Sequence, residues 1–134
     1  MREILFRGKR VDNGEWVYGA YYGLCRMTNK AGDFGYAHLI RQSDNEPLYR
    51  VDPETVGQFT GMYDRNGKKI FEGDIVSSNK RKTWIGRGKV WFYNGAFFCG
   101  EREWAKFLRM VCLEDEQAVV IGNIHDNKEL LNED

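Results

Sequence analysis

The chain has 134 residues, enough for one domain of ordinary size, and its 20 Lys and Arg balance its 20 Asp and Glu. A content of 15 Gly and 2 Pro with 14% aromatic residues suits short strands joined by tight turns, and it excludes a disordered or collagen-like chain. No apolar run approaches the roughly 18 residues of a membrane helix, and the first residues lack the hydrophobic region of a signal peptide. We therefore expect a cytoplasmic protein that does not engage a membrane.

The first part of the chain predicts a β-hairpin. Residues 4–22 hold two strands separated by Asp12-Asn13-Gly14, residue types that tolerate the positive φ of a tight turn. Gly19 and Gly23 interrupt the second strand, as a bulge or a bend would. The Asn, Gly and Asp content that follows predicts a loop over residues 26–35. The next two short strands are expected at residues 36–41 and 48–51.

The middle of the chain predicts two further hairpins. The turn Asp64-Arg65-Asn66-Gly67-Lys68 separates a strand at residues 56–62 from a strand at residues 70–76, in which Gly73 allows a kink. Asn94-Gly95 joins residues 90–93 to residues 96–99, and a strand, Asn-Gly, strand pattern is a strong hairpin signal.

The last part of the chain is less sharply patterned. Apolar residues at helical spacing predict a short helix over residues 102–111, and a strand there is the alternative. Residues 118–124 predict a buried strand. Asp126 can then cap a final helical turn, with Glu129 as its capping-box partner.

Candidate catalytic and metal-binding residues are few. His38 lies in an apolar strand and is best interpreted as a packed strand residue. Asp64, Glu72 and Asp74 could chelate a cation, but we favour a bend at Gly73 in which Asp74 bonds nearby backbone amides. Cys25, Cys99 and Cys112 are too widely spaced to indicate a zinc site or a disulfide. The sequence therefore predicts no catalytic residue, no metal and no cofactor.

A basic segment over residues 77–88 is the candidate binding site. Residues 1–100 carry 16 Lys and Arg against 11 Asp and Glu, whereas residues 101–134 carry 4 against 9. Such opposed charge suits an encounter with a partner or head-to-tail self-association, and it equally suits a solvated surface. Basic and aromatic side chains together can hold an anionic partner. The side chains proposed for this contact are those of Lys80, Arg81, Lys82, Trp84 and Arg87.

Five segments spread along the chain carry a family resemblance. They are Met1-Arg2-Glu3-Ile4 with Phe6-Arg7, Val56-Gly57-Gln58-Phe59-Thr60-Gly61, Asp64-Arg65-Asn66-Gly67-Lys68, Ile70-Phe71-Glu72-Gly73-Asp74-Ile75-Val76 and Val120-Ile121-Gly122-Asn123-Ile124. These segments resemble the YopX family, small proteins carried by bacterial phages and prophages. Lys128 stands where the family favours Pro, which changes only how a final turn begins. The resemblance implies a predominantly β protein with a small SH3-like barrel, and it implies no known activity.

Residues and resemblance together predict a mainly β protein. An SH3-like barrel is expected over residues 56–134, with the N-terminal hairpin and short strands of residues 1–55 packed on it as one compact unit, and a short helical turn at the end. We interpret the chain as a non-enzymatic binding or assembly module of the host bacterial cytoplasm. It would act through protein–protein contacts, as a homo-oligomer or as an adaptor to a host or phage protein. Nucleic-acid binding through residues 77–88 is the alternative.

Overall fold

The computed structural model describes residues 3–78, 86–93, 96–99 and 118–131. Contacts between its residues divide the chain into two units, residues 1–58 and residues 59–134, and each is described by itself. The described strands all pair antiparallel, and the described helical segments are two 3-10 turns, so the protein is mainly β, as predicted. Neither turn has the length or the hydropathy to span a bilayer.

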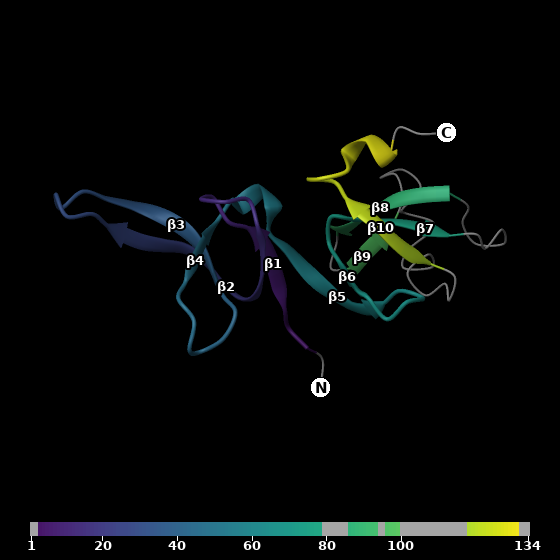
Figure 1. Cartoon of the computed structure of the whole chain (residues 1–134), viewed down its shortest axis with the longest axis horizontal. Coiled ribbons are helices and arrows are strands. Elements are labelled where there is room, and N and C mark those ends of the chain that lie inside the picture. Colours follow the sequence, from purple (N-terminus) through teal and green to yellow (C-terminus); the bar gives the residue numbers. More distant parts are fainter. Residues whose placement is uncertain (1–2, 79–85, 94–95, 100–117, 132–134) are drawn as a thin grey trace. The chain divides into compact units, whose positions relative to one another are not determined.

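The first unit is built on an antiparallel sheet (Figure 1). Its order is β4-β3-β2-β1, and the first residues of β5 (Gly57–Tyr63) pair with β1. A 3-10 turn, η1 (Pro53–Thr55), leads from β4 to β5 and is capped by Asp52. The four strands are β1 (Phe6–Lys9), β2 (Trp16–Thr28), β3 (Phe34–Arg41) and β4 (Tyr49–Val51).

The predicted N-terminal hairpin is confirmed. Gly14 has a φ of 73°, and its N–H donates to the Arg10 carbonyl to close the turn between β1 and β2. Gly23 and Leu24 form the predicted irregularity, because the pairing of β2 with β3 shifts by one residue between Tyr22 and Cys25. Gly19 is different. It lies in regular pairing opposite Phe6, and a glycine is needed there because the backbone of Arg41 lies close to it.

The loop predicted over residues 26–35 is wrong. β2 continues to Thr28 and β3 begins at Phe34, so only residues 29–33 form the turn. Asn29 organises this turn, because its Oδ1 accepts the N–H groups of Ala31 and Asp33. Figure 1 shows the paired ends of β2 and β3 extending away from β1 and β4.

The core of the first unit lies at the inner half of this sheet. Val17, Ile40 and Val51 are buried, and the partly buried residues around them are Phe6, Tyr21, Tyr49 and Val56. Gly19 permits a close approach between β2 and the end of β3 in this sheet. A Cβ at Gly19 would lie 2.0 Å from the carbonyl oxygen of Arg41, a distance that no side chain tolerates. The backbone of β2 and the end of β3 therefore approach as only glycine allows.

The second unit contains the remaining strands. β5 pairs with β6 (Lys69–Phe71), and a four-stranded sheet follows in the order β10-β7-β8-β9. One cluster of buried residues in this unit consists of Ile70, Val76, Val90, Phe97 and Ala118, with Met62 and Val120 packed against it. The strands of the second sheet are β7 (Asp74–Ser78), β8 (Gly86–Tyr93), β9 (Ala96–Cys99) and β10 (Val119–Asn123).

Both hairpins predicted for the middle of the chain are present. Asp64 and Lys68 close the turn between β5 and β6, with Gly67 at a φ of 82°. Gly73, at a φ of 93°, breaks the predicted 70–76 strand into β6 and β7. β8 pairs with β9 as expected, although Asn94 and Gly95 lie outside the described residues. The described strands close no sheet, so the SH3-like barrel stays a prediction.

The predictions for the last part of the chain have mixed outcomes. The helix or strand over residues 102–111 lies outside the described residues. β10 is present but mostly half-buried rather than buried. The helical turn is the 3-10 segment η2 (Lys128–Leu131), and Asp126 accepts a hydrogen bond from the Asn123 side chain at 3.2 Å.

Gly19 provides a test of the first unit. Gly19→Ala places a methyl group against the Arg41 carbonyl, and we expect it to lower the free energy of unfolding by about 3 kcal/mol. Gly35→Ala in β3 is the matched control, because a Cβ there meets nothing within 4 Å. Urea unfolding of both variants measures the effect. Equal stability of the two variants would contradict the close approach at Gly19.

Candidate functional site

The basic segment predicted as a binding site falls largely outside the described structure. Lys80, Arg81, Lys82 and Trp84 lie outside the described residues. Arg87 lies in β8, where its backbone is in register with Ser77, and its side chain is outside the description. The described side chains contain the other candidates for a functional site.

The Asp64 carboxylate accepts hydrogen bonds from three backbone N–H groups of the second unit. Its Oδ1 accepts the N–H groups of Asn66 at 2.8 Å and Lys68 at 2.9 Å, and its Oδ2 accepts that of Val120 at 3.0 Å. Burial opposes ionisation of this carboxyl group, but the three N–H donors and the Lys68 charge outweigh it and hold its pKa below the ordinary aspartate value. Asp64 thus ties the β5–β6 turn to β10.

Asp74 has a similar structural task, as predicted. It is buried, and its Oδ2 accepts the Phe71 N–H at 2.7 Å across the bend at Gly73. Among the described residues, no group of three or more His, Cys, Asp or Glu could hold a metal ion. The three carboxylates considered from the sequence are not brought together as a cation site in the described structure.

His38 belongs to the packing of the first unit. Its Nδ1 and the Tyr21 hydroxyl are 2.5 Å apart, and the two rings stack with centroids 5.9 Å apart. Cys25 in β2 is a free thiol, whereas the side chain of Cys99 and all of Cys112 lie outside the description. His38 is thus the packed strand residue that the sequence indicates.

The outer half of the first sheet is a two-stranded ribbon. We define the β2–β3 ribbon as residues 22–28 of β2, residues 34–37 of β3 and the turn between them. β1 pairs with β2 only at residues 16–19, and β4 pairs with β3 only at residues 38–40. In the part of the chain that the structure describes, the ribbon consequently has no neighbouring strand on either edge.

Large apolar side chains are exposed on this ribbon. Phe34 is 56% exposed and Tyr36 is 61% exposed, although both lie in regular strand pairing. An isolated two-stranded ribbon is marginally stable in water, and exposing several such side chains together costs free energy. The exposed apolar residues of the ribbon are Tyr22, Leu24, Met27, Phe34 and Tyr36.

One face of the ribbon is aromatic. Arg26 pairs with Tyr36 and Thr28 with Phe34, so these side chains share a face, which we call the aromatic face. The Arg26 guanidinium lies 4.1 Å from the centroid of the Phe34 ring. Phe34 and Tyr36 meet edge to face with centroids 6.3 Å apart. These contacts hold the three side chains in place while leaving the rings open to solvent.

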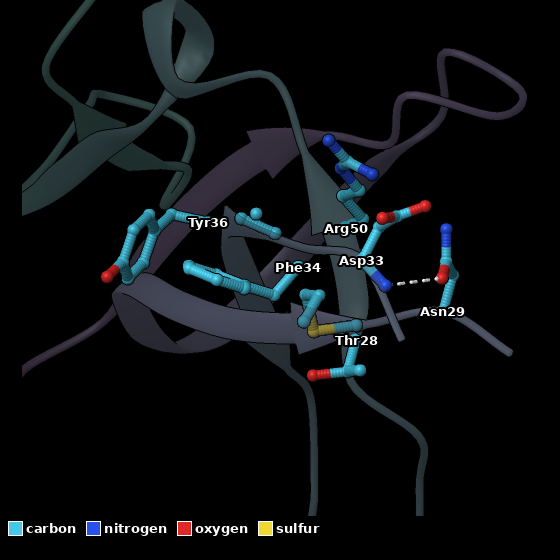
Figure 2. Close-up of a pocket in the computed structure, with 9 residues that line it drawn as sticks. Thr28, Asn29, Asp33, Phe34, Tyr36 and Arg50 are labelled. Carbon is cyan, nitrogen blue, oxygen red and sulfur yellow. Dashed lines mark hydrogen bonds between the residues drawn. The ribbon is translucent and has the colours of Figure 1, made fainter. Parts of the chain in front are cut away.

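The opposite face, which we call the pocket face, carries Met27, Gly35 and Ala37. A pocket of about 280 Å³ lies at the ribbon and is lined by these residues, by Asp33 and Arg50, and also by Thr28, Asn29, Phe34 and Tyr36. Figure 2 shows the rings of Phe34 and Tyr36 on one side of the drawn group, and Arg50, Asp33 and Asn29 on the other. The pocket thus has aromatic side chains toward one end and charged side chains toward the other.

The ribbon was not predicted from the sequence, although one pattern in the sequence indicates it. Phe34, Tyr36, His38 and Ile40 recur every second residue, which is the period of a strand. The Asn, Gly and Asp residues just before them predicted a long loop, whereas they occupy only the five-residue turn 29–33.

Asp64→Asn tests the structural assignment of this carboxylate. An amide cannot satisfy all three N–H donors, because its NH₂ would face the Val120 N–H, so we expect a loss of about 1–3 kcal/mol in the free energy of unfolding at pH 7. A lowered pKa gives stability that is fully present above the ordinary value of about 3.9 and is lost as pH falls below it. The difference between the two proteins should therefore shrink below pH 4 in urea unfolding.

Asp44→Asn is the control for this prediction, because Asp44 is exposed. We expect it to leave stability nearly unchanged at pH 7. A difference between wild type and Asp64→Asn that stays constant down to pH 2 would show that ionisation of Asp64 does not contribute.

Comparisons with known proteins found a solved structure of similar fold and a matching family model. The crystal structure of protein EF1440 from Enterococcus faecalis is similar with a TM-score of 0.55 and 22% sequence identity, over 98% of this chain and 99% of that chain. No curated protein matches the chain. The family model described as YopX protein matches residues 5–132. The chain therefore belongs to the YopX family, as its sequence motifs indicate.

Proposed function

We propose that this protein is a non-enzymatic protein-interaction module and that the β2–β3 ribbon is its docking surface. The observation that carries the proposal is the exposure of Phe34 and Tyr36 in an ordered strand that no third strand covers within the described structure. Folding has placed these rings in water although the first unit has a core elsewhere. A partner that covers them removes that cost.

The composition of the aromatic face supports this proposal. Tyr, Phe and Arg are enriched at the centres of protein interfaces, where aromatic side chains contribute much of the binding free energy. Arg26 already lies over Phe34, so little side-chain entropy remains to be lost when a partner arrives. The ribbon is therefore partly preorganised for contact.

Two kinds of protein partner fit this surface. A second copy of the chain would give the homo-oligomer expected from the opposed charges of residues 1–100 and 101–134. A host or phage protein would make the chain an adaptor, and the phage or prophage origin implied by the sequence resemblance supports either role in the bacterial cytoplasm. Nucleic-acid binding through residues 77–88 is the competing function, and the experiment below distinguishes it.

For the second unit we retain the SH3-like barrel as a proposal. The antiparallel order β10-β7-β8-β9 and the sharp bend at Gly73 support it, because small barrels turn their corners at such bends. In this arrangement the second unit would be a scaffold, and the docking side chains would come from the first.

Photo-crosslinking tests the proposed docking surface. A benzoylphenylalanine in place of Tyr36 should crosslink to protein, either to a second copy of the chain or to a partner in host lysate. The same group in place of Tyr63, a similarly exposed tyrosine in β5, is the matched control and should give at least fivefold less product. Mass spectrometry after nuclease treatment identifies the product.

Phe34→Ser adds a second measurement to the crosslinking experiment. It removes the ring under Arg26 and should reduce the Tyr36 crosslink severalfold while leaving the melting temperature within a few degrees, because Phe34 lies outside the core. Equal crosslinking from the Tyr36 and Tyr63 positions would overturn the proposal. Crosslinks that vanish with nuclease would favour the nucleic-acid alternative.

A further inference from the structure

We infer that the β2–β3 ribbon captures its partner as an added β-strand on the open edge of β3, and that the preferred segment is extended with an acidic residue between two apolar ones. This inference rests on the proposed docking function and specifies its chemistry. Strand addition takes affinity from backbone hydrogen bonds and specificity from pockets for alternate side chains. The ribbon offers both features at Phe34, Gly35 and Tyr36.

The hydrogen bonds of β4 show which residues of β3 direct their backbone N–H and C=O groups toward β4. The Asp52 N–H donates to the Lys9 carbonyl at 2.9 Å, and the Val11 N–H donates to the Arg50 carbonyl at 3.0 Å. These two bonds flank the bridge between Arg10 and Val51, so the backbone groups of Val51 itself point the other way, toward β3. Val51 and His38 are consequently a hydrogen-bonded pair.

The same alternation continues along β3. His38 directs its N–H and C=O toward β4. Tyr36 and Phe34, two and four positions before it, direct theirs to the same edge of β3. The Asn29 N–H confirms this parity, because it donates to the carbonyl of Asp33, an odd-numbered residue that faces β2. β4 ends at Val51, so the backbone groups of Phe34 and Tyr36 point to an edge that no described strand occupies.

An antiparallel strand laid on this edge can form four backbone hydrogen bonds, two with Phe34 and two with Tyr36. Its residues opposite these two point their side chains to the aromatic face, where apolar groups would cover the exposed rings. The residue between them lies opposite Gly35 and points to the pocket face. The register thus decides which side chains of the partner face the aromatic rings and which one faces the pocket.

The pocket face favours an acidic side chain at that central position. Gly35 leaves the pocket open, because a Cβ there would meet nothing within 4 Å. Arg50 lines the same pocket from β4, the strand in line with the added one (Figure 2). Arg26 lies on the aromatic face, so the charged side chains that line the pocket are Arg50 and Asp33. Arg50 is the cation in the pocket that can pair with a carboxylate and would repel an ammonium group.

The edge of β2 is the other open edge of the ribbon, and it fits a partner less well. The bulge at Gly23 and Leu24, with Leu24 at a φ of 55°, interrupts the regular spacing of its backbone groups. β3 has no such interruption, and the pocket with Arg50 adjoins it. We therefore assign the added strand to β3.

Two capped pentapeptides test the inference on the full-length protein. Thr-Val-Glu-Val-Thr should shift the backbone amide signals of Phe34 and Tyr36 in an NMR titration and slow their hydrogen exchange. Thr-Val-Lys-Val-Thr should bind about fivefold more weakly, as expected for one partly exposed charge pair. Arg50→Glu should reverse this preference. Equal binding of the two peptides by both proteins would overturn the acidic specificity.

Methylated peptides separate strand addition from side-chain docking. N-methylation of either valine removes an N–H that faces β3 and should abolish the shifts, whereas N-methylation of the glutamate removes an outward-facing N–H and should leave them. Equal effects of the two methylations would overturn the strand addition. Gly35→Val, which favours the strand and fills the pocket, should weaken the Glu peptide at least fivefold without unfolding the hairpin.

The outcomes also separate this inference from the proposed function. Crosslinking at Tyr36 without any peptide-induced shift at millimolar concentration would leave the docking surface standing and overturn the strand addition. Absence of both crosslinks and shifts would overturn both.

Discussion

The antiparallel pairing of β2 with β3 is the interaction on which the first unit depends. Its inner half sets Tyr21 opposite Ile40, which places the tyrosine ring beside the core formed by Val17, Ile40 and Val51. The same pairing brings His38 against Tyr21 and requires Gly19 where β2 approaches Arg41. Its outer half continues past every neighbouring strand in the described residues and carries the exposed rings. The inner half of the β2–β3 pairing thus supports the core, and the outer half exposes the aromatic rings.

In the second unit, backbone groups around one glycine unite three segments. The Gly73 N–H donates to the Val90 carbonyl at 2.7 Å, and the Gly73 carbonyl accepts the Ile124 N–H at 2.9 Å. Asp74 secures the same bend through Phe71, while Asp64 fastens the preceding turn to Val120. Two of the three carboxylates considered as a cation site, Asp64 and Asp74, therefore stabilise the second unit by accepting backbone N–H groups, since a buried acceptor must be matched by donors.

The features that could be predicted from the sequence are those fixed by local chemistry. The turn at Asp12-Asn13-Gly14 and the bend at Gly73 need positive φ, and residue type alone reports that need. Gly19 could not be understood this way, because the atom that excludes a side chain belongs to Arg41, far along the chain. The ribbon was hidden for a related reason. Asn29 bonds its own turn, so a polar stretch that resembles a loop can join two long strands. The YopX resemblance gave the family, but it could not show that Phe34 and Tyr36 are exposed.

The bulge at Gly23 and Leu24 decides which chemistry each face of the ribbon displays. Tyr22 pairs with Leu39 and Cys25 with Ala37, so three steps along β2 match two along β3. If both residues paired regularly instead of forming the bulge, Arg26 would lie opposite Gly35 instead of Tyr36, and its cation would leave the Phe34 ring for the other side of the ribbon. A chain of this fold that lost one of the two residues could pair regularly and would keep Arg26 opposite Tyr36. The bulge therefore lets the ribbon differ in length at this point while each face keeps its chemistry.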